Sequence, residues 1–518
     1  MNVNKPACAT QRRTHWRGPS ITSTLLLAGV MAVAGAFPAS AQDDASIVVV
    51  GPIEPNSLDV CESSNQAPGR ITRQTVYETL TEVSPEDGSV LPRLGTEWEQ
   101  IDDRTWRFKL VENATFHDGE PFNAAAVAYN LERSRSNPDC AMYGRAFGGL
   151  QVTATPVDDY TVDIVSDAPA PIMPTNLSML AIASTATPME MQRLSAGTGP
   201  YEVTDWTPGR IVIEANESYW GEQPQIRKVT TVFRSEDAVR AAMVATGEAD
   251  IAIDVSPEDA NNPETDFTYL NSETTFIRFD LRNEPLNDVR VRQAFNYAID
   301  RDVMLGTVVP EGSIKATQLP VSSILGHNAN LEPYPYDPER ARQLLAEARA
   351  DGVPVDAPIR FIARSGNFAQ VDEFAQAVAA MLQDVGLNIS LEMMERSRNT
   401  LFQGKPFPED SGPYVHLIMS DNNLGDASFS VFPHYHSNGV QSMVADPELD
   451  AAIDQAASAT GDERRALYES IFQRLHEEIV PAMMMFHMLA VNRVGPRLDW
   501  RPTIKANSEL DFDKMRLN

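Results

Sequence analysis

The chain of 518 residues is short of cysteine and of basic residues, and each shortage excludes a class of protein. Three cysteines are too few for a disulfide-rich scaffold or for a metal cluster held by several thiolates. The 42 basic residues stand against 72 acidic ones, and the resulting formal net charge of -30 repels phosphate backbones and anionic lipid. Nucleic acid is therefore not an expected partner.

The sequence also lacks the motifs of common enzyme classes. We find no G-x-S-x-G elbow, no Walker A loop and no set of kinase motifs. The segment 476–480 (HEEIV) has no second histidine where H-E-x-x-H requires one. The glycines of 197–199 are followed by Pro200 and not by the helix of a dinucleotide-binding loop. We therefore expect neither catalysis nor a cofactor.

The longest apolar stretch lies near the N-terminus. Basic residues without any acid occupy 1–20, an apolar run follows at about 25–37, and Ala39-Ser40-Ala41 come next. This order predicts a secretory signal peptide at 1–41, cleaved near Ala41, because the run is too short to span a bilayer comfortably. An N-terminal anchor helix is the alternative. With no cysteine at the cleavage point, we expect an exported, periplasmic protein that is not a lipoprotein; Sec and twin-arginine export both stay open.

Two cysteines remain after cleavage, Cys61 and Cys140. An even number of cysteines in an oxidising compartment is compatible with one disulfide. Two unpaired buried thiols are the alternative. The sequence leaves both open.

Strand-like and helical patterns alternate along the chain. Strands are predicted at 46–50, 229–233, 276–281, 359–363 and 387–392. Apolar residues at helical spacing predict helices over 291–299, 338–348 and 374–385. Asp288 is the expected N-cap of the first, and Pro338 opens the second. The order strand, helix, strand predicts a mixed α/β fold, in which these apolar stripes form the core.

Six motifs, read together and in order, resemble the family 5 extracellular solute-binding proteins of bacterial ABC importers. They are 116–122 (FHDGEPF), 197–201 (GTGPY), 216–221 (NESYWG), 247–251 (GEADI), 285–294 (PLNDVRVRQA) and 336–338 (YDP). None is decisive alone, but together they cover nearly all of the chain after the signal peptide. The members that it resembles bind dipeptides, oligopeptides or nickel.

The resemblance implies a two-lobed α/β periplasmic-binding-protein fold. Mixed sheets with flanking helices build two lobes that close over a ligand in the cleft between them. We expect lobe I to be discontinuous and to comprise 42–79, 197–277 and 490–518. An extra subdomain of lobe I is expected at 80–196, and lobe II at 278–489.

The resemblance also implies ligand-binding residues. In dipeptide binders of this family an arginine after a strand holds the ligand carboxylate, and Arg364 lies one residue before that position. An aspartate in a loop after another strand holds the ligand ammonium. Asp421 is the better match here, and Asp426 is the second. A polar loop at Ser64, Asn65 and Gln66 matches a third contact region.

Further side chains are expected near the cleft. They are Asn423, Tyr435, Arg145, Arg396 and Arg398. The histidines beside Tyr435 have H-x-H spacing, a weak metal signal for which no third ligand stands at a defined spacing, so no metal site is assigned.

The expected function is that of a monomeric periplasmic binding protein. It would capture a zwitterionic small solute, such as a short peptide, an amino-acid derivative or an opine, and deliver it to an ABC permease in the inner membrane. The alternative is capture of a metal chelate or a polycarboxylate by several arginines of the cleft. An exported hydrolase is the enzyme-class alternative, which the missing motifs disfavour.

Overall fold

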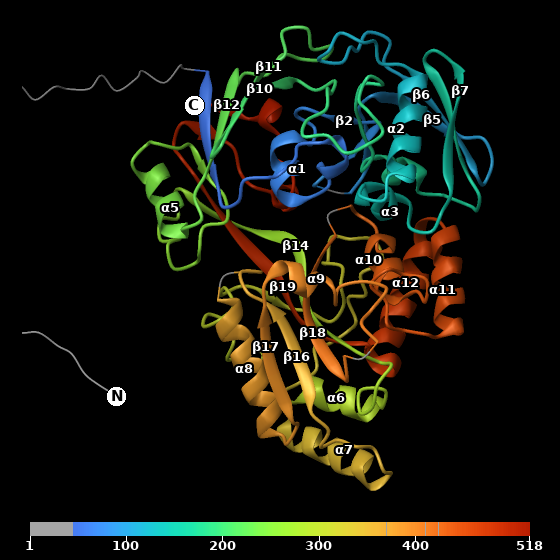
Figure 1. Cartoon of the computed structure of the whole chain (residues 1–518), viewed down its shortest axis with the longest axis vertical. Helices are drawn as coiled ribbons and strands as arrows, with labels where there is room; N and C mark the ends of the chain where they lie inside the picture. The colour runs from blue at the N-terminus through green and yellow to red at the C-terminus, as the bar shows by residue number, and fades with distance from the viewer. Residues whose placement is uncertain (1–44, 87, 369, 410, 423) are drawn as a thin grey trace, which may run out of the picture. The chain divides into compact units, whose positions relative to one another are not determined.

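The computed structural model of this protein describes residues 45–518, with the exception of 87, 369, 410 and 423 (Figure 1). The signal peptide predicted at 1–41 lies outside the described residues. Among the helices of the described part, none has both the length and the apolar character needed to cross a membrane.

A mixed sheet of eleven strands organises the described chain. Across the sheet the strands follow in the order β10 (Tyr201–Thr207), β11 (Arg210–Ala215), β12 (Lys228–Phe233), β1 (Ser46–Gly51), β13 (Ile251–Ala252), β19 (Ala482–Val494), β14 (Asp266–Phe279), β18 (Tyr414–Asp421), β16 (Ile359–Arg364) and β17 (Ile389–Met394). The eleventh strand, β15 (Ile314–Lys315), pairs with β19. All five strands predicted from the sequence are present in this sheet.

Two long strands, β14 and β19, join the two ends of this sheet (Figure 1). β19 pairs with β13 toward one end, and β14 pairs with β18 toward the other. At about 3.3 Å per residue, strands of 14 and 13 residues reach across both halves. The mixed α/β fold is confirmed, but strands that we assigned to separate lobes share one ladder. The domain boundaries remain a prediction.

The pairing of β14 with β19 is irregular at two points. Its register shifts between Leu270 and Thr274 and again between Thr275 and Phe276. Within the first interval Ser272 has a φ of 63°, in the left-handed region that residues other than glycine seldom adopt. This first irregularity lies beside Glu273, a residue of the candidate site.

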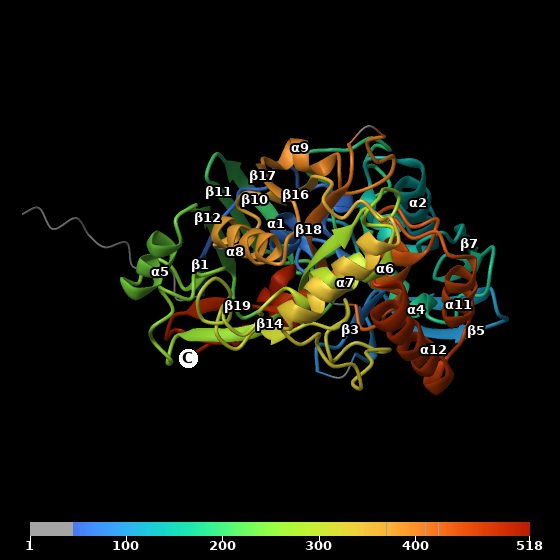
Figure 2. The same ribbon diagram turned by 90° about the horizontal axis from the view of Figure 1, so that it is seen from below.

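Three helices occupy the segments for which the apolar spacing predicted them. They are α6 (Val289–Tyr297), α7 (Pro338–Ala350) and α8 (Val371–Asp384). The side chain of Asp288 caps α6 by accepting from the backbone N–H of Arg290. Their apolar faces are buried in one hydrophobic cluster with β16 and β17, beside which α8 lies in both views (Figures 1 and 2).

A second, four-stranded sheet lies within the segment 80–196. Its strand order is β5 (Gly95–Gln100), β6 (Thr105–Leu110), β8 (Thr161–Ser166) and β7 (Val152–Asp158), and α2 (Ala124–Ser136) packs on it. Three short pairs complete the strands: β2 (Glu78–Thr79) with β9 (Ala181–Ile182), β3 (Thr81–Val83) with β4 (Val90–Pro92), and β20 (Leu498–Asp499) with β21 (Arg516–Leu517). The remaining α-helices are α1 (Gln66–Thr72), α3 (Ala141–Phe147), α4 (Met173–Leu177), α5 (Asp237–Ala245), α9 (Arg396–Thr400), α10 (Ser428–Tyr435), α11 (Pro447–Ser458) and α12 (Gly461–Arg474).

Candidate functional site

Two oppositely charged residues end neighbouring strands of the large sheet. Arg364 is the last residue of β16, and Asp421 is the last residue of β18. β16 and β18 are parallel, so their carboxyl ends lie at the same edge of the sheet. The guanidinium of Arg364 donates to the side-chain oxygen of Asn367, a neutral partner. The structure therefore places Arg364 and Asp421 at the same edge of the sheet, and their contact with a ligand remains a prediction.

A second carboxylate, that of Glu273, stands beside Asp421. Glu273 on β14 is the direct antiparallel partner of Asp421 on β18. Side chains of directly opposed residues in such a pair point to the same face, with β-carbons about 5 Å apart. Sequence reasoning missed Glu273. The one local signal was an acid within the β-prone run 271–279 (NSETTFIRF), which does not reveal its partner on a distant strand.

Neutral groups hold the two carboxylates. Glu273 accepts hydrogen bonds from the amides of Gln66, at 2.7 Å, and Asn271, at 3.1 Å. Asp421 accepts one from the hydroxyl of Ser272. Burial, followed by the negative charges of Asp421 and Asp254, raises the pKa of Glu273 to about 8.

Arg145 of α3 supplies a second guanidinium. It donates to the backbone oxygen of Ser64 at 3.0 Å. Burial lowers the pKa of Arg145, and the negative charge of Asp421 opposes this effect. Burial raises the pKa of Asp421, offset in part by the hydrogen bond from Ser272 and the positive charge of Arg145. The two side chains thus act on each other electrostatically without a direct ion pair.

We refer to Arg145, Glu273, Arg364 and Asp421 as the charge cluster. Arg145 and Asp421 have exposed surface and the other two are half-buried, yet burial is the largest influence on the pKa of all four. Side chains that water reaches while protein surrounds them are typical of a cleft wall. None of the four forms an ion pair with another described residue.

The neighbouring charges, by contrast, are paired. Arg70 forms a two-pronged ion pair with Asp254 at 2.7 and 3.1 Å. Arg73 lies 3.6 Å from a carboxylate oxygen of Glu509. The absence of ion pairs is therefore specific to the charge cluster and does not extend to the neighbouring charged residues.

The predicted polar loop reaches the charge cluster in part. Ser64 contributes its backbone oxygen to Arg145, and Gln66 contributes its amide to Glu273. Asn65 instead precedes α1 and its amide donates to Glu62. Asn423 lies outside the described residues.

Two further predicted arginines lie on the short helix α9, and both are exposed. The positive charge of Arg396 contributes to lowering the pKa of Arg364, so these two side chains are neighbours. Arg398 instead interacts with Glu392 on β17. Of the two, Arg396 lies near the charge cluster.

The structure contradicts two of the predicted contacts. Asp426 is buried, and both its oxygens accept from the guanidinium of Arg464, at 2.7 and 2.8 Å, so neither is free for a ligand. Tyr435 is buried at the end of α10 among apolar residues, because its ring completes the hydrophobic packing there. It lines two enclosed cavities of about 20 and 10 Å³, too small for a solute.

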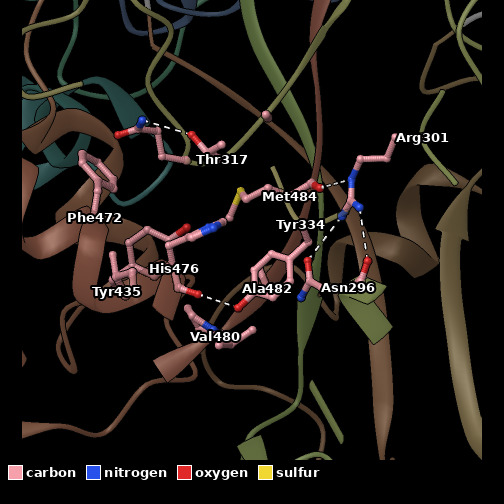
Figure 3. Close-up of a pocket in the computed structure, with 14 residues that line it drawn as sticks. Asn296, Arg301, Thr317, Tyr334, Tyr435, Phe472, His476, Val480, Ala482 and Met484 are labelled. Carbon is pink, nitrogen blue, oxygen red and sulfur yellow. Dashed lines mark hydrogen bonds between the residues drawn. The ribbon is translucent and has the colours of Figure 1, made fainter. Parts of the chain in front are cut away.

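A cavity of about 970 Å³ lies elsewhere. It is lined mainly by residues of 299–336, and none of the four residues of the charge cluster borders it. The small cavity of about 20 Å³ adjoins it and shares Arg301, Thr317 and Tyr334 with it (Figure 3). In Figure 3 the guanidinium of Arg301 donates to Met484 and Asn296, so this charge is used internally.

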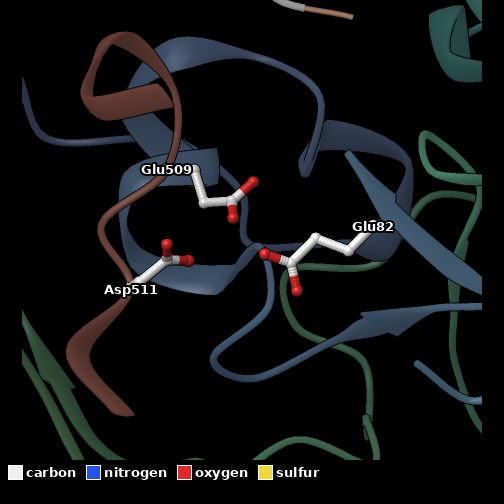
Figure 4. A group of neighbouring side chains, drawn as sticks. All are labelled: Glu82, Glu509 and Asp511. Carbon is white, nitrogen blue, oxygen red and sulfur yellow. The ribbon is translucent and has the colours of Figure 1, made fainter. Parts of the chain in front are cut away.

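Three carboxylates near the C-terminus have the spacing of a metal site: Glu82, Glu509 and Asp511 (Figure 4). The ammonium of Lys505 already lies between them, 2.7 Å from Glu82 and 2.9 Å from Glu509. Lys514 is 2.6 Å from Glu82. The positive charges of Lys505 and Lys514 lower the pKa of Glu82 although burial opposes this. The lysines thus occupy the place of a metal cation.

A disulfide supports the part of the cluster around Arg145. The sulfur atoms of Cys61 and Cys140 are bonded, with Cα atoms 5.0 Å apart. Cys61 precedes the loop that contains Ser64, and Cys140 is the N-cap position of α3, which carries Arg145. The bond therefore joins the two segments that the hydrogen bond from Arg145 to Ser64 also connects.

Comparison with known proteins gives consistent matches along the chain. The family model described as bacterial extracellular solute-binding proteins, family 5 Middle, matches residues 89–439. The nickel-binding periplasmic protein of Escherichia coli (strain K12) is 28% identical over 511 residues, and the alignment covers 90% of this chain and 93% of that protein.

Two solved structures have the same fold. The periplasmic binding protein DppA of Helicobacter pylori, in complex with the peptide STSA, superposes with a TM-score of 0.78 at 18% identity, covering 91% of this chain and 98% of that one. The periplasmic binding protein AgaA from A. tumefacien R10, in complex with agropinic acid, gives 0.76 at 20% identity, covering 91% and 99%.

Proposed function

This chain belongs to the bacterial extracellular solute-binding proteins of family 5, and on that basis we propose that it captures a zwitterionic small solute for an ABC importer. The solute would be a short peptide, an amino-acid derivative or an opine. The family consists of binding proteins of transporters and not of enzymes, and the chain would hand its solute to a permease in the inner membrane.

One observation carries this proposal: two guanidiniums and two carboxyl groups lie close together, partly exposed and without ion-pair partners among the described residues. Charges that lose water without gaining a partner raise the free energy strongly. A ligand that brings an ammonium and a carboxylate removes this cost as the cleft excludes water. The ligand then binds where its charges are complemented.

Each charge of the ligand has a partner of suitable geometry. The planar guanidinium of Arg364 offers two parallel N–H groups to a carboxylate. Asp421 retains a carboxylate oxygen that Ser272 does not engage, and this oxygen can accept from an ammonium. Arg145, which interacts electrostatically with Asp421, and Glu273, which opposes Asp421 across the strand pair, complete the arrangement.

The ligands named for the relatives do not choose the solute, since they range from nickel to peptide and agropinic acid. The composition of the charge cluster is more selective. A polycarboxylate or an anionic chelate would be repelled by the carboxylate of Asp421 and would keep Glu273 in its neutral form, and the cluster contains no histidine or cysteine to bind a metal directly. The zwitterion therefore fits better than the chelate.

The experiment starts with the protein purified from the periplasm and mass spectrometry of the small molecules released on denaturation. A panel of dipeptides, opines and nickel chelates is then tested by thermal shift and calorimetry. A zwitterion bound in the micromolar range, about −8 kcal/mol, supports the proposal. Binding of nickel chelates alone contradicts it, and turnover of a peptide or ester would revive a hydrolase.

The proposal includes export as a free monomer. The same periplasmic preparation gives the mass of the intact chain. Cleavage after Ala41 without added lipid is expected, and a mass that retains residues 1–41 or includes acyl chains contradicts this part. Size-exclusion chromatography with light scattering tests the monomer.

A further inference from the structure

The charge cluster contains two opposed carboxyl groups that no protein cation pairs with. Glu273 and Asp421 are directly opposed on β14 and β18. Like charges in this position destabilise an antiparallel pair, so Glu273 keeps its proton in the free protein, and a cationic partner would favour its ionised form. The described side chains that donate to them are neutral: Gln66 and Asn271 donate to Glu273, and Ser272 donates to Asp421, with Asn507 also acting on Asp421.

A nearby carboxylate shows what a neutralised acid in this region looks like. Asp254 contributes to the raised pKa of Glu273, so it is close to it, and Arg70 holds Asp254 through both oxygens. Glu273 and Asp421 have the same kind of surroundings but no arginine of their own. The pair therefore has places for two cationic groups.

The two guanidiniums of the cluster are unmatched in the same way. Arg145 donates to the backbone oxygen of Ser64, and Arg364 donates to the amide oxygen of Asn367. Arg145 interacts electrostatically with Asp421, and Arg364 with Glu273. The two carboxyl groups thus lie next to each other, with Arg145 beside Asp421 and Arg364 beside Glu273.

We propose that the solute is doubly zwitterionic, with two cationic nitrogens and two carboxylates. The inference rests on the proposed function and names the class of solute more closely. Asp421 and Glu273 would each receive one cationic nitrogen, and Arg145 and Arg364 would each receive one carboxylate. A basic residue joined to an acidic one in a dipeptide has this charge set, and so has an N-carboxyalkyl derivative of lysine or arginine.

A solute with one charge of each sign would leave one arginine and one glutamate unmatched after water is excluded. The doubly zwitterionic solute leaves none, because each of the four groups then has a partner of opposite charge. Glu273 is therefore the specificity-determining residue that separates the two classes, because a single carboxylate at Asp421 suffices for one ammonium.

The test uses isosteric probes and isothermal titration calorimetry. Lysyl-glutamate, norleucyl-glutamate and lysyl-glutamine differ by one charge each, and N-(1-carboxyethyl)lysine with its norleucine analogue repeats the comparison on a second scaffold. For the wild-type protein, at least one scaffold should lose about tenfold or more in affinity when lysine becomes norleucine. Replacing lysyl-glutamate by lysyl-glutamine, which removes one carboxylate of the probe, should lower the affinity by a similar factor.

The variant Glu273→Gln tests whether Glu273 causes the difference in affinity between the lysine and norleucine probes. Its affinity for the lysine probe should fall to that for the norleucine probe, while its affinity for the norleucine probe stays within about twofold of wild type. Glu339→Gln, a substitution on the surface helix α7, should behave as wild type on both. This double comparison separates a lost charge contact from a general disturbance.

The outcomes distinguish the inference from the proposed function. Equal affinity for lysine and norleucine probes, with or without Glu273, overturns the doubly zwitterionic solute and leaves a singly zwitterionic one. If no probe binds, the inference is tested by the composition of the co-purified solute, as measured by mass spectrometry. Two basic nitrogens and two carboxylates support the inference, and a zwitterion with fewer overturns it. A solute that is not a zwitterion overturns the proposed function as well.

Discussion

The carboxylate of Asp426 is bound through both oxygens by the guanidinium of Arg464, at 2.7 and 2.8 Å. Five residues earlier, Asp421 has no ion-pair partner among the described residues. Asp426, just after the end of β18, therefore stabilises the fold through an ion pair, whereas Asp421, at the end of that strand, can still bind a ligand. The two predict opposite responses to the same substitution.

We expect Asp426→Asn to destabilise the protein without weakening solute binding. The substitution leaves the guanidinium of Arg464 buried without its counter-charge, which costs about 3–5 kcal/mol. Urea unfolding measures the loss of stability, and calorimetry with the co-purified solute measures binding below the unfolding range. Unchanged stability would contradict the role assigned to this ion pair.

Asp421→Asn should show the reverse pattern. It keeps the shape of the side chain but removes the charge that pairs with an ammonium, so affinity should fall by about 2–5 kcal/mol. Stability of the free protein should hold or rise, since a repulsive neighbour of Glu273 disappears. If the solute were an anionic chelate, this variant would bind it equally well or better.

Arg364→Ala should lower the affinity by a similar amount, because the solute carboxylate loses its partner in a site without water. Arg364→Lys should restore only part of it, since an ammonium cannot replace a two-pronged guanidinium. Both variants should melt close to wild type without solute. Wild-type affinity in Arg364→Ala and in Asp421→Asn together would contradict the site.

The free protein should lose stability through Glu273 as the pH rises. The pKa of Glu273 is about 8 in the fold against an ordinary value near 4.5, so the folded state binds more protons between these values. The contribution is complete below about pH 4.5 and is lost by about pH 8. Unfolding of wild type and Glu273→Gln should therefore diverge between pH 5 and 9, with the variant the more stable at pH 9; parallel curves would contradict this.

Lys505→Met should destabilise the C-terminal part of the fold. It removes the cation that lies between Glu82, Glu509 and Asp511, and two buried acids and one half-buried acid then repel one another. Loss of one partner from such a buried group costs about 3–5 kcal/mol. Lys514→Met is the matched control and should cost less, because that side chain is 47% exposed. Equal effects would contradict a special role for Lys505.

The sequence could predict where a side chain lies only as far as local order along the chain decides it. Arg364 and Asp421 each end a strand with a recognisable apolar run, so their position at one sheet edge follows from parallel pairing, while their binding of a ligand remains a prediction. The sequence alone could not show that Asp426 forms an ion pair while Asp421 does not. The partner of Asp426, Arg464, lies 38 residues later on α12. The packing of helices decides that contact, and no local pattern encodes it.

Glu273 escaped prediction for a related reason. Its role depends on which residue of β18 it opposes, and the register of two strands far apart in sequence is set by the whole sheet. The fold was predictable because apolar periodicity marks each element separately. The cluster was predictable only to the extent that its members sit at the ends of such elements.

The disulfide between Cys61 and Cys140 has a practical consequence for any laboratory that produces the protein. It fixes the backbone on both sides of the contact between Arg145 and Ser64. Material made in a reducing cytoplasm would carry two thiols there, and its loop would be held by fewer constraints. Batches of identical sequence but different thiol content are then expected to differ in measured affinity. A free-thiol assay belongs beside every titration.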